Sequence, residues 1–124
     1  MIGKLYSSTM SFFDLKTNKN AFKNRPVLII GDIRNNDYTV LPVSTISISS
    51  NIDTEYDIKI DPAKYPALNL RKISYIRTHK ALTIHRAELY KEISDLKALE
   101  PDLFTQIMLK YEQWTKEIIA KARL

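Results

Sequence analysis

The sequence contains no cysteine and no long apolar run. Without cysteine there is no disulfide framework, thiol nucleophile or thiolate metal site, which agrees with a cytoplasmic protein. The apolar run at residues 27–30 is far shorter than the roughly 20 residues that a membrane span needs. Residues 1–6 read directly into a strand and lack the apolar stretch of a signal peptide. We therefore expect a cytoplasmic protein that does not associate with a membrane.

The sequence also lacks internal repeats, low-complexity tracts and linkers. Its 124 residues are enough to bury a core without disulfides or a structural metal. The proportions of hydrophobic residues (44%) and charged residues (27%) are those of an ordinary globular protein. We expect one domain over residues 1–124.

The chain has a formal net charge of +5, from 19 Lys and Arg against 14 acidic residues. Such a surplus attracts polyanions without identifying one. Much of the positive charge lies in two stretches far apart in the sequence, which contain Lys16, Lys19, Lys23 and Arg25, and Arg71, Lys72, Arg77, Lys80 and Arg86. Two interpretations remain open: a solvated surface, or one phosphate-binding face.

The first two thirds of the chain have patterns typical of β-strands. Residues 26–30 form an apolar run ended by Gly31, which predicts a strand buried on both faces. Turn residues at 34–37 separate it from residues 38–43, which predicts a hairpin. Because Pro42 cannot donate to a ladder, the second strand should reach an edge or an end there. Further strands are expected at 2–13, 56–60, 73–79 and 82–84, a polar loop at 16–24, an irregular crossing at 44–54, and a helical turn at 86–90.

An amphipathic helix is expected near the C-terminus. Pro101 suits a first helical position, and Asp102 complements the helix dipole. Apolar residues then recur at helical spacing, namely Leu103, Ile107, Tyr111, Trp114 and Ile118, with Phe104 and Met108 beside them. We interpret this stripe as core or dimer interface. The predicted fold class is α+β, mostly β: a small, strongly bent antiparallel domain capped by the helix.

Several segments, taken in order, resemble the MazF/PemK toxin family. Asn24-Arg25-Pro26-Val27-Leu28-Ile29-Ile30 is similar to the family's Arg-Pro-Val-Leu-Ile strand. Leu41-Pro42-Val43-Ser44-Thr45 looks like its Pro-(Val/Ile)-Thr-Ser segment with the hydroxyl residues exchanged. Ser74-Tyr75-Ile76-Arg77-Thr78-His79 and the following Leu82-Thr83-Ile84-His85 complete the match, the latter where the family often has Arg-Thr-Ile-Asp. The resemblance implies an SH3-like antiparallel barrel, a homodimer, cleavage of single-stranded RNA and a cognate antitoxin protein.

The chain departs from the family at three places. His79 stands where some members have aspartate, and His85 replaces a strand-end aspartate, so we interpret His85 as structural. Ala21, Phe22, Lys23 and Asn24 precede Arg25, where many members carry Gly or Gln. That loop shapes substrate recognition in the family, so the RNA sequence that is cut does not carry over.

The implied reaction is attack by a 2′-hydroxyl on the neighbouring phosphate, which leaves a 2′,3′-cyclic phosphate and a 5′-hydroxyl. It needs a base, an acid and cations around the charged phosphorane. Cofactors are not required. With two histidines, no cysteine and no tight carboxylate cluster, the sequence is also a poor source of a metal site.

Four residues are the candidates for catalysis. Arg25 matches the family's catalytic arginine, and its guanidinium could grip the scissile phosphate; the alternative is a surface arginine at a strand entrance. Ser44 retains a hydroxyl for phosphate oxygens, unless it merely caps a strand end. Arg77 matches a family arginine assigned to phosphate binding or catalysis, and His79, two residues further along the strand, suits proton transfer. His79 is equally well interpreted as structural.

The candidates for RNA binding lie around these four residues. Phe22, with Asn20 and Asn24, could stack an unpaired base and read its edge, or Phe22 could fold onto the core. Thr45 offers a second hydroxyl to a phosphate. The remaining candidates are cations, namely Lys16, Lys19, Lys23 and Lys80.

Two other functions remain open. A catalytically inactive RNA-binding or regulatory relative is favoured by the change at His79 and disfavoured by the retained Arg25, Ser44 and Arg77. A gyrase-binding toxin like CcdB, which shares the expected fold, depends on a Trp-Gly-Ile ending, whereas this chain ends Lys121-Ala122-Arg123-Leu124. The leading hypothesis is the RNA-cleaving toxin.

Overall fold

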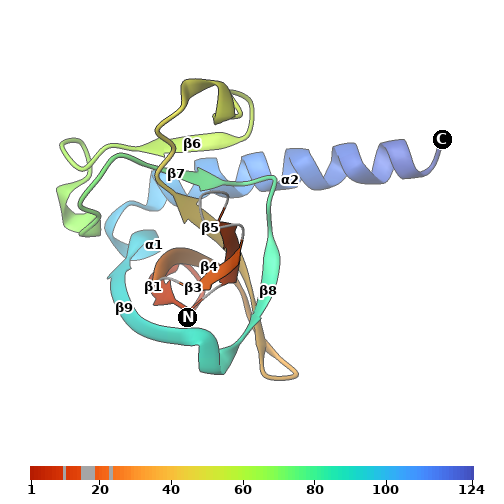
Figure 1. Ribbon diagram of the computed structural model, residues 1–124. Coiled ribbons are helices and arrows are strands. Elements are labelled where there is room, and N and C mark those ends of the chain that lie inside the picture. The colour runs from red at the N-terminus through yellow and green to blue at the C-terminus, as the bar shows by residue number, and fades with distance from the viewer. Residues whose placement is uncertain (10, 15–18, 23) are drawn as a thin grey trace.

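The fold is a bent antiparallel sheet with a long helix near its C-terminus (Figure 1). The computed structural model describes residues 1–9, 11–14, 19–22 and 24–124, and only the backbone of 11–14 and 19–22. The main sheet contains β1 (Lys4–Ser8), β4 (Arg25–Arg34), β5 (Asp37–Ser44), β6 (Asp57–Ile60), β7 (Ser74–Arg77), β8 (Leu82–His85) and β9 (Leu89–Asp95). The helices are α1 (Leu96–Leu99) and α2 (Pro101–Ala122), with short 3-10 turns η1 (Ser49–Asn51), η2 (Pro66–Leu68) and η3 (Arg86–Glu88). A separate two-stranded sheet pairs β2 (Ser11–Asp14) with β3 (Lys19–Phe22).

The predicted fold class, mostly β with a C-terminal helix, is confirmed. The strands follow the order β6-β7-β5-β4-β1-β9, and β8 adds to β5. Strand β5 pairs with β8 over residues 37–40 and with β7 at Val43 and Ser44. This change of partner curls the sheet into an incomplete barrel. Pro42 lies between these two paired stretches. Its missing N–H therefore interrupts neither the pairing of β5 with β8 nor the pairing with β7.

The core lies between the curled sheet and the start of α2. Leu28 of β4, Leu41 of β5 and Ile76 of β7 are fully buried, and they share one cluster with Ile107 of α2. Burying an aliphatic side chain of this size contributes about 1.5–3 kcal/mol. These non-local contacts hold β4, β5 and β7, whose ends carry the candidate site, in fixed relation to the helix.

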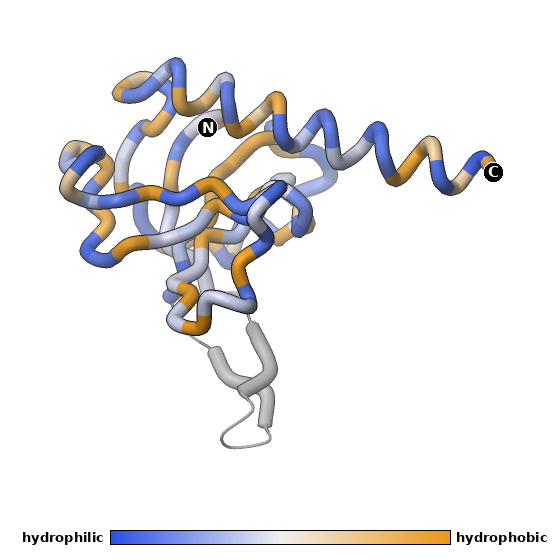
Figure 2. Tube along the Cα trace, turned by 90° about the horizontal axis from the view of Figure 1, so that it is seen from above, coloured by the Kyte–Doolittle hydropathy of each residue, from blue (hydrophilic) through white to orange (hydrophobic). Residues whose placement is uncertain are grey.

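The two halves of α2 have different surroundings. Leu103, Phe104 and Ile107 are buried, whereas Ile118 and Ile119 are about half exposed. The second half of the helix extends beyond the sheet (Figures 1 and 2). Ion pairs one turn apart also support it, joining Lys116 to Glu112 and Lys121 to Glu117. The predicted helix is confirmed, but only the first part of its apolar stripe is core.

Several predicted boundaries were wrong. Strand β3 lies within the segment expected to be a loop, and β9 follows the helical turn at η3. Strand β4 continues through Gly31 to Arg34. Its pairing with β5 shifts register at Gly31, where only a glycine fits. A Cβ atom at Gly31 would lie 2.9 Å from the Cβ atom of Thr39. Strand β7 ends at Arg77, so His79 lies in a turn and not on the strand.

The predicted hairpin turn between β4 and β5 is present. Asn35 and Asn36 have φ angles of 52° and 67°, the left-handed conformation that a tight hairpin requires and that asparagine tolerates. Among the described residues, none of the helices combines the length and apolar character required to span a membrane.

Candidate functional site

One hollow at the end of the sheet brings together five of the residues predicted for the site. It has a volume of about 440 Å³ and lies where β4 begins and where β5 and β7 end. We call it the arginine hollow, and it is lined by Arg25, Ser44, Thr45, Ile46, Ser47, Ile48, Asn51, Arg77 and Lys80. The sheet topology explains the convergence, since β5 lies between β4 and β7. Residues separated by about 50 positions in the sequence thereby face one space.

Arg25 enters the arginine hollow from the first residue of β4. Its carbonyl oxygen accepts a hydrogen bond of 2.9 Å from the hydroxyl of Ser8, a buried residue of β1. The two residues are also partners in the β1–β4 register. The backbone of Arg25 is therefore fixed, while its side chain remains half-buried at the hollow.

Arg77 is held in place by Asp57, which sequence reasoning did not identify. Nε of Arg77 donates to Oδ1 of Asp57 at 3.1 Å, and Nη2 donates to Oδ2 at 3.3 Å. Nη2 also donates to the carbonyl oxygen of Asn51, at 3.2 Å. The side chain of Asp57 is completely buried, and its Oδ2 accepts a further bond of 2.8 Å from the backbone N–H of Asp53. A two-point contact of this kind fixes the plane of the guanidinium group.

His79 does not line the arginine hollow. Its Nδ1 lies 3.7 Å from Oδ1 of Asp57, and its Nε2 lies 3.7 Å from Oδ2 of Asp53. Both distances are too long for hydrogen bonds, and Nδ1 is buried with no hydrogen-bond partner among the residues that the structure describes. The side chain is 12% exposed. His79 and Arg77 therefore approach the same carboxylate, but only Arg77 bonds to it.

Aromatic residues join His79 to the long helix. The ring of His79 stacks on Tyr56 at 6.0 Å and meets the edge of Trp114 on α2, also at 6.0 Å. The hydroxyl of Tyr56 donates to the carboxylate of Glu117, and this bond raises the pKa of Tyr56 to about 12. The same bond, with Lys121 beside it, lowers the pKa of Glu117. The support of the site thus extends from Asp57 to the second half of α2.

Asp53 is the other acidic group beside His79. Partial burial alone would raise the pKa of Asp53. The backbone N–H groups of Tyr56 and Glu55, together with His79 and Arg77, outweigh that effect and lower its pKa. Its carboxylate also begins the turn before β6 by accepting the N–H of Glu55 at 2.9 Å. Asp53 therefore stays ionised while it shapes the loop beside the arginine hollow.

The remaining predicted residues are not all described. Asn24 lies outside the arginine hollow and lines a neighbouring one that also includes Thr45. Lys16 and Lys23 lie outside the described residues, as do the side chains of Lys19 and Phe22, whose backbone belongs to β3. His85 is exposed, and its Nδ1 accepts the N–H of Ala87 at 3.0 Å, so it caps η3 as a structural residue would.

The arginine hollow has the electrostatics of an anion site. Among the residues that the structure describes, three cations line it, Arg25, Arg77 and Lys80, and none of the lining residues is a carboxylate, although the buried Asp57 bonds to Arg77 from outside the hollow. The hydroxyls of Ser44 and Thr45 add neutral hydrogen-bond donors. In the part of the chain that the structure describes, no three His, Cys, Asp or Glu side chains are grouped so that they could hold a metal ion. Such a hollow can bind a phosphate group and stabilise added negative charge on it.

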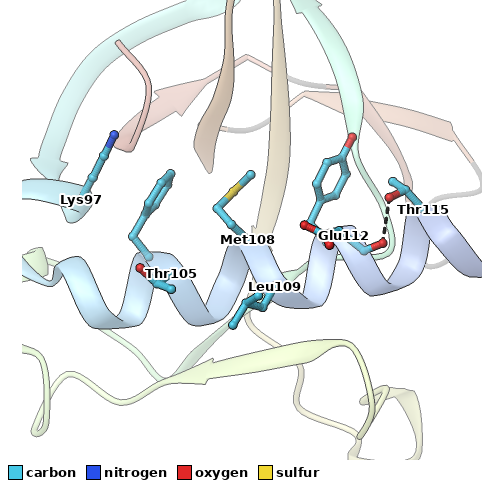
Figure 3. Close-up of a pocket in the computed structure, with 8 residues that line it drawn as sticks. Lys97, Thr105, Met108, Leu109, Glu112 and Thr115 are labelled. Carbon is cyan, nitrogen blue, oxygen red and sulfur yellow. Dashed lines mark hydrogen bonds between the residues drawn. The ribbon is translucent and has the colours of Figure 1, made fainter.

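A second hollow, beside α2, has a different character (Figure 3). It has a volume of about 560 Å³, and its walls are mainly apolar, with Phe104, Met108, Leu109 and Tyr111 among them. Its charged residues are Lys97 and Glu112, and none of the predicted site residues that the structure describes lines it. Its chemistry does not suit a phosphate, so the candidate site is the arginine hollow.

Comparison with known proteins gives one family and one fold. The family described as "PemK-like, MazF-like toxin of type II toxin-antitoxin system" matches residues 11–111. The solved structure of the Mycobacterium tuberculosis toxin MazF-mt6 is similar, with a TM-score of 0.53 and 20% sequence identity, over 88% of this chain and 96% of that one. At this identity the likeness shows the fold alone. No curated protein matches the sequence.

Proposed function

The chain belongs to the PemK-like, MazF-like toxins of type II toxin–antitoxin systems, and we propose that it is a metal-independent endoribonuclease that cleaves single-stranded RNA. A toxin of this type has a cognate antitoxin, and the members of the family are generally endoribonucleases. The observation that carries the proposal is the convergence of Arg25 and Arg77, from β4 and β7, on one hollow whose described lining residues include no carboxylate. Arg25 and the part of the Arg77 guanidinium group that Asp57 and Asn51 do not occupy present positive charge to this hollow, which suits a phosphate under nucleophilic attack.

The proposed reaction is an intramolecular transesterification of the RNA phosphodiester. The 2′-oxygen attacks the adjacent phosphorus and loses its proton to a base, and the bond from phosphorus to the 5′-oxygen breaks. The departing oxygen takes a proton from an acid, so the products are a 2′,3′-cyclic phosphate and a 5′-hydroxyl. Neither an external nucleophile nor an oxidant is needed. The protein must supply proton transfer and charge stabilisation.

Charge stabilisation falls to the two arginines. The phosphorane formed during attack carries more negative charge than the starting diester, so cations positioned in advance favour it. Asp57 supplies that positioning for Arg77, because its bonds occupy Nε and Nη2 and fix the guanidinium plane. Asp57 is itself buried and has no access to RNA, so it is a positioning residue and not a catalytic one.

The hydroxyls and the remaining cations serve binding. Ser44 and Thr45 lie at the end of β5, where they can donate to non-bridging phosphate oxygens. Lys80 adds a point charge at the same hollow. The proposed RNA path continues over the segment before β4, with contributions from Lys16, Lys19, Phe22, Lys23 and Asn24.

His79 is the proposed group for proton transfer. In the described conformation it faces Asp57 and Asp53, so its ring must turn toward the RNA when the substrate binds. Acid–base contacts often become short only in the complex with substrate. The other interpretation is that His79 only supports Asp57, and the pH dependence of cleavage distinguishes the two.

The proposed partners are the antitoxin and a second copy of the chain. A disordered antitoxin segment with acidic and apolar residues would complement the cations of the arginine hollow and would be ordered on binding. The half-exposed isoleucines of α2, Ile118 and Ile119, are available for contact in a homodimer. The cleavage assay below is run without an antitoxin.

The deciding experiment incubates the purified protein with a long single-stranded RNA in the presence of EDTA and maps the ends. We expect discrete cuts with cyclic-phosphate and 5′-hydroxyl ends. Arg25→Ala should reduce the rate by on the order of 10²–10³-fold. Lys116→Ala, a surface cation on α2 that lies outside the arginine hollow, is the control and should cut like the wild type. Folded wild-type protein that cuts none of a varied set of RNAs would overturn the proposal.

A further inference from the structure

A larger hollow of about 700 Å³ adjoins the arginine hollow, and we call it the flanking hollow. Thr45 lines both. Two pairs of neighbours in the sequence divide between them: Asn24 and Val43 line the flanking hollow, whereas Arg25 and Ser44 line the arginine hollow. An RNA strand bound at the two arginines can therefore continue into the flanking hollow across the ends of β4 and β5. Its volume is within the range typical of pockets for small molecules.

The flanking hollow carries an excess of positive charge. Arg71 and Lys72, from the loop before β7, and Lys91 of β9 are exposed along it. None of their side chains forms an ion pair with any residue that the structure describes. The carboxylate among the lining residues, Glu92, is paired at 2.8 Å with Lys4, which lies outside the hollow. The three cations are thus available to a ligand with negative charge.

The flanking hollow also offers groups that suit a base. Pro26, Leu70 and Ile93 give it apolar surface, and two asparagines add amide donors and acceptors. Asn69 is held in the left-handed conformation with φ of 59°, and its Nδ2 donates to the carbonyl oxygen of Ile93 at 3.4 Å. That hydrogen bond orients the amide without using its Oδ1 atom. An oriented amide reads the hydrogen-bonding edge of an unpaired base.

We propose that the flanking hollow is a subsite for a nucleotide next to the scissile phosphate. The base lies against the apolar surface within reach of Asn69, and the adjoining phosphate lies at Arg71 and Lys72. An acidic protein segment would use the same cations, but it would use neither the amides nor the continuity with the arginine hollow. The inference rests on the proposed ribonuclease activity, and it gives the flanking nucleotide a role in substrate recognition.

The test compares four proteins on an RNA in which the wild-type cut has been mapped. They are the wild type, the double variant Arg71→Ala/Lys72→Ala, the single variant Asn69→Ala, and a control variant Lys116→Ala/Arg123→Ala that removes the same two residue types from exposed positions on α2 and directly after it. Circular dichroism verifies that each is folded. Binding is measured against salt concentration with the same RNA carrying a 2′-deoxy nucleotide at the cut.

For the double variant we expect KM to rise by tenfold or more, with a much smaller change in kcat. The plot of log affinity against log salt should become less steep by about 0.7 for each phosphate that the variant no longer binds. Asn69→Ala should change base preference at one position beside the cut. A double variant indistinguishable from the control, with wild type that cuts RNA, overturns the subsite and leaves the ribonuclease intact. A wild type that cuts no RNA overturns both.

The same variants also distinguish an RNA subsite from a binding site for an acidic protein segment. A poly-glutamate peptide serves as the probe for a negatively charged protein segment. If its binding depends on Arg71 and Lys72 while binding of the 2′-deoxy RNA does not, the subsite is overturned and the flanking hollow is assigned to a protein partner.

Discussion

Asp57 and Arg77 face each other across β6 and β7 as register partners, and their side chains form a two-point contact with Asp57 fully buried. The pair sits at the end of the described β6–β7 ladder, beside the arginine hollow. Because the carboxylate of Asp57 is buried, it has few hydrogen-bond partners other than the guanidinium group that it faces. The direction of Arg77 is therefore set by the sheet and does not depend on a bound substrate.

Replacing Asp57 by Asn should impair cleavage more than binding. The amide keeps the shape but not the charge, so the guanidinium loses its fixed orientation, and kcat should fall on the order of 10–100-fold. The free energy of unfolding should fall by about 1–3 kcal/mol. Steady-state kinetics and chemical denaturation measure the two effects.

A double variant with Arg77 distinguishes a positioning role of Asp57 from a merely structural one. In the double variant Asp57→Asn/Arg77→Ala, kcat should equal that of Arg77→Ala alone, because Asp57 acts through Arg77. Independent effects that multiply would show that Asp57 does not act by positioning Arg77.

His79→Gln should distinguish proton transfer from support. Glutamine preserves much of the size and polarity but transfers no proton, so kcat should fall on the order of 10²–10⁴-fold and one limb of the pH–rate profile should disappear. Single-turnover cleavage between pH 5 and 9 provides the measurement. Unchanged cleavage with an unchanged profile would leave His79 as a contact of Asp57 and the aromatic residues only.

The Tyr56–Glu117 hydrogen bond should make stability depend on pH at both extremes. Because the pKa of Tyr56 is raised from 10.0 to about 12 on folding, its contribution is full below pH 10 and is lost as the pH rises toward 12. The pKa of Glu117 is lowered from 4.5, so its contribution is full above pH 4.5 and is lost as the pH falls through the lower value. The difference in Tm between wild type and Tyr56→Phe should therefore shrink at both extremes. Tyr90→Phe, at an exposed tyrosine, should show no such pattern.

Two isoleucines on α2 provide a matched test of packing. Ile107→Ala removes a fully buried side chain and should lower the free energy of unfolding by about 2–5 kcal/mol. Ile118→Ala, at a position 46% exposed, should cost less than about 1 kcal/mol. Denaturant titrations of both variants compare them. Equal costs would mean that the second half of the helix is covered in solution, as a homodimer would cover it.

The elements with strong local patterns were predicted from the sequence. The apolar run of β4, the asparagine turn and the amphipathic start of α2 each depend on neighbouring residues, and all are present. Strand β3 was missed because its polar composition is typical of a loop, and its pairing with β2 is a property of the hairpin and not of either strand alone. The continuation of β4 through Gly31 depends on the close approach of Thr39, which only the paired strands reveal.

The candidate site was predictable in part, for a related reason. Arg25, Ser44 and Arg77 were identified because motifs around them resemble a family, and the fold brings them to one hollow. Asp57 belongs to no motif, and only the strand that carries it, at residues 56–60, was expected. Its importance arises from its register with Arg77, which depends on how β6 and β7 pair. His79 was expected on the strand beside Arg77, and the end of β7 turned it away.

The contacts between α2 and the loop before β6 have a consequence for the order in which a newly made chain becomes active. Tyr56 and Glu117 are 61 residues apart, and Trp114 closes over His79 from the same turn of helix. A ribosome releases the strands that carry Arg25 and Arg77 first, and these strands can pair while α2 is still being translated. Tyr56 and His79 meet their partners on α2 only after residues 114–117 emerge. Under the proposed function, the sheet therefore places the two arginines before α2 supports the residues beside them, and an antitoxin can bind during that interval.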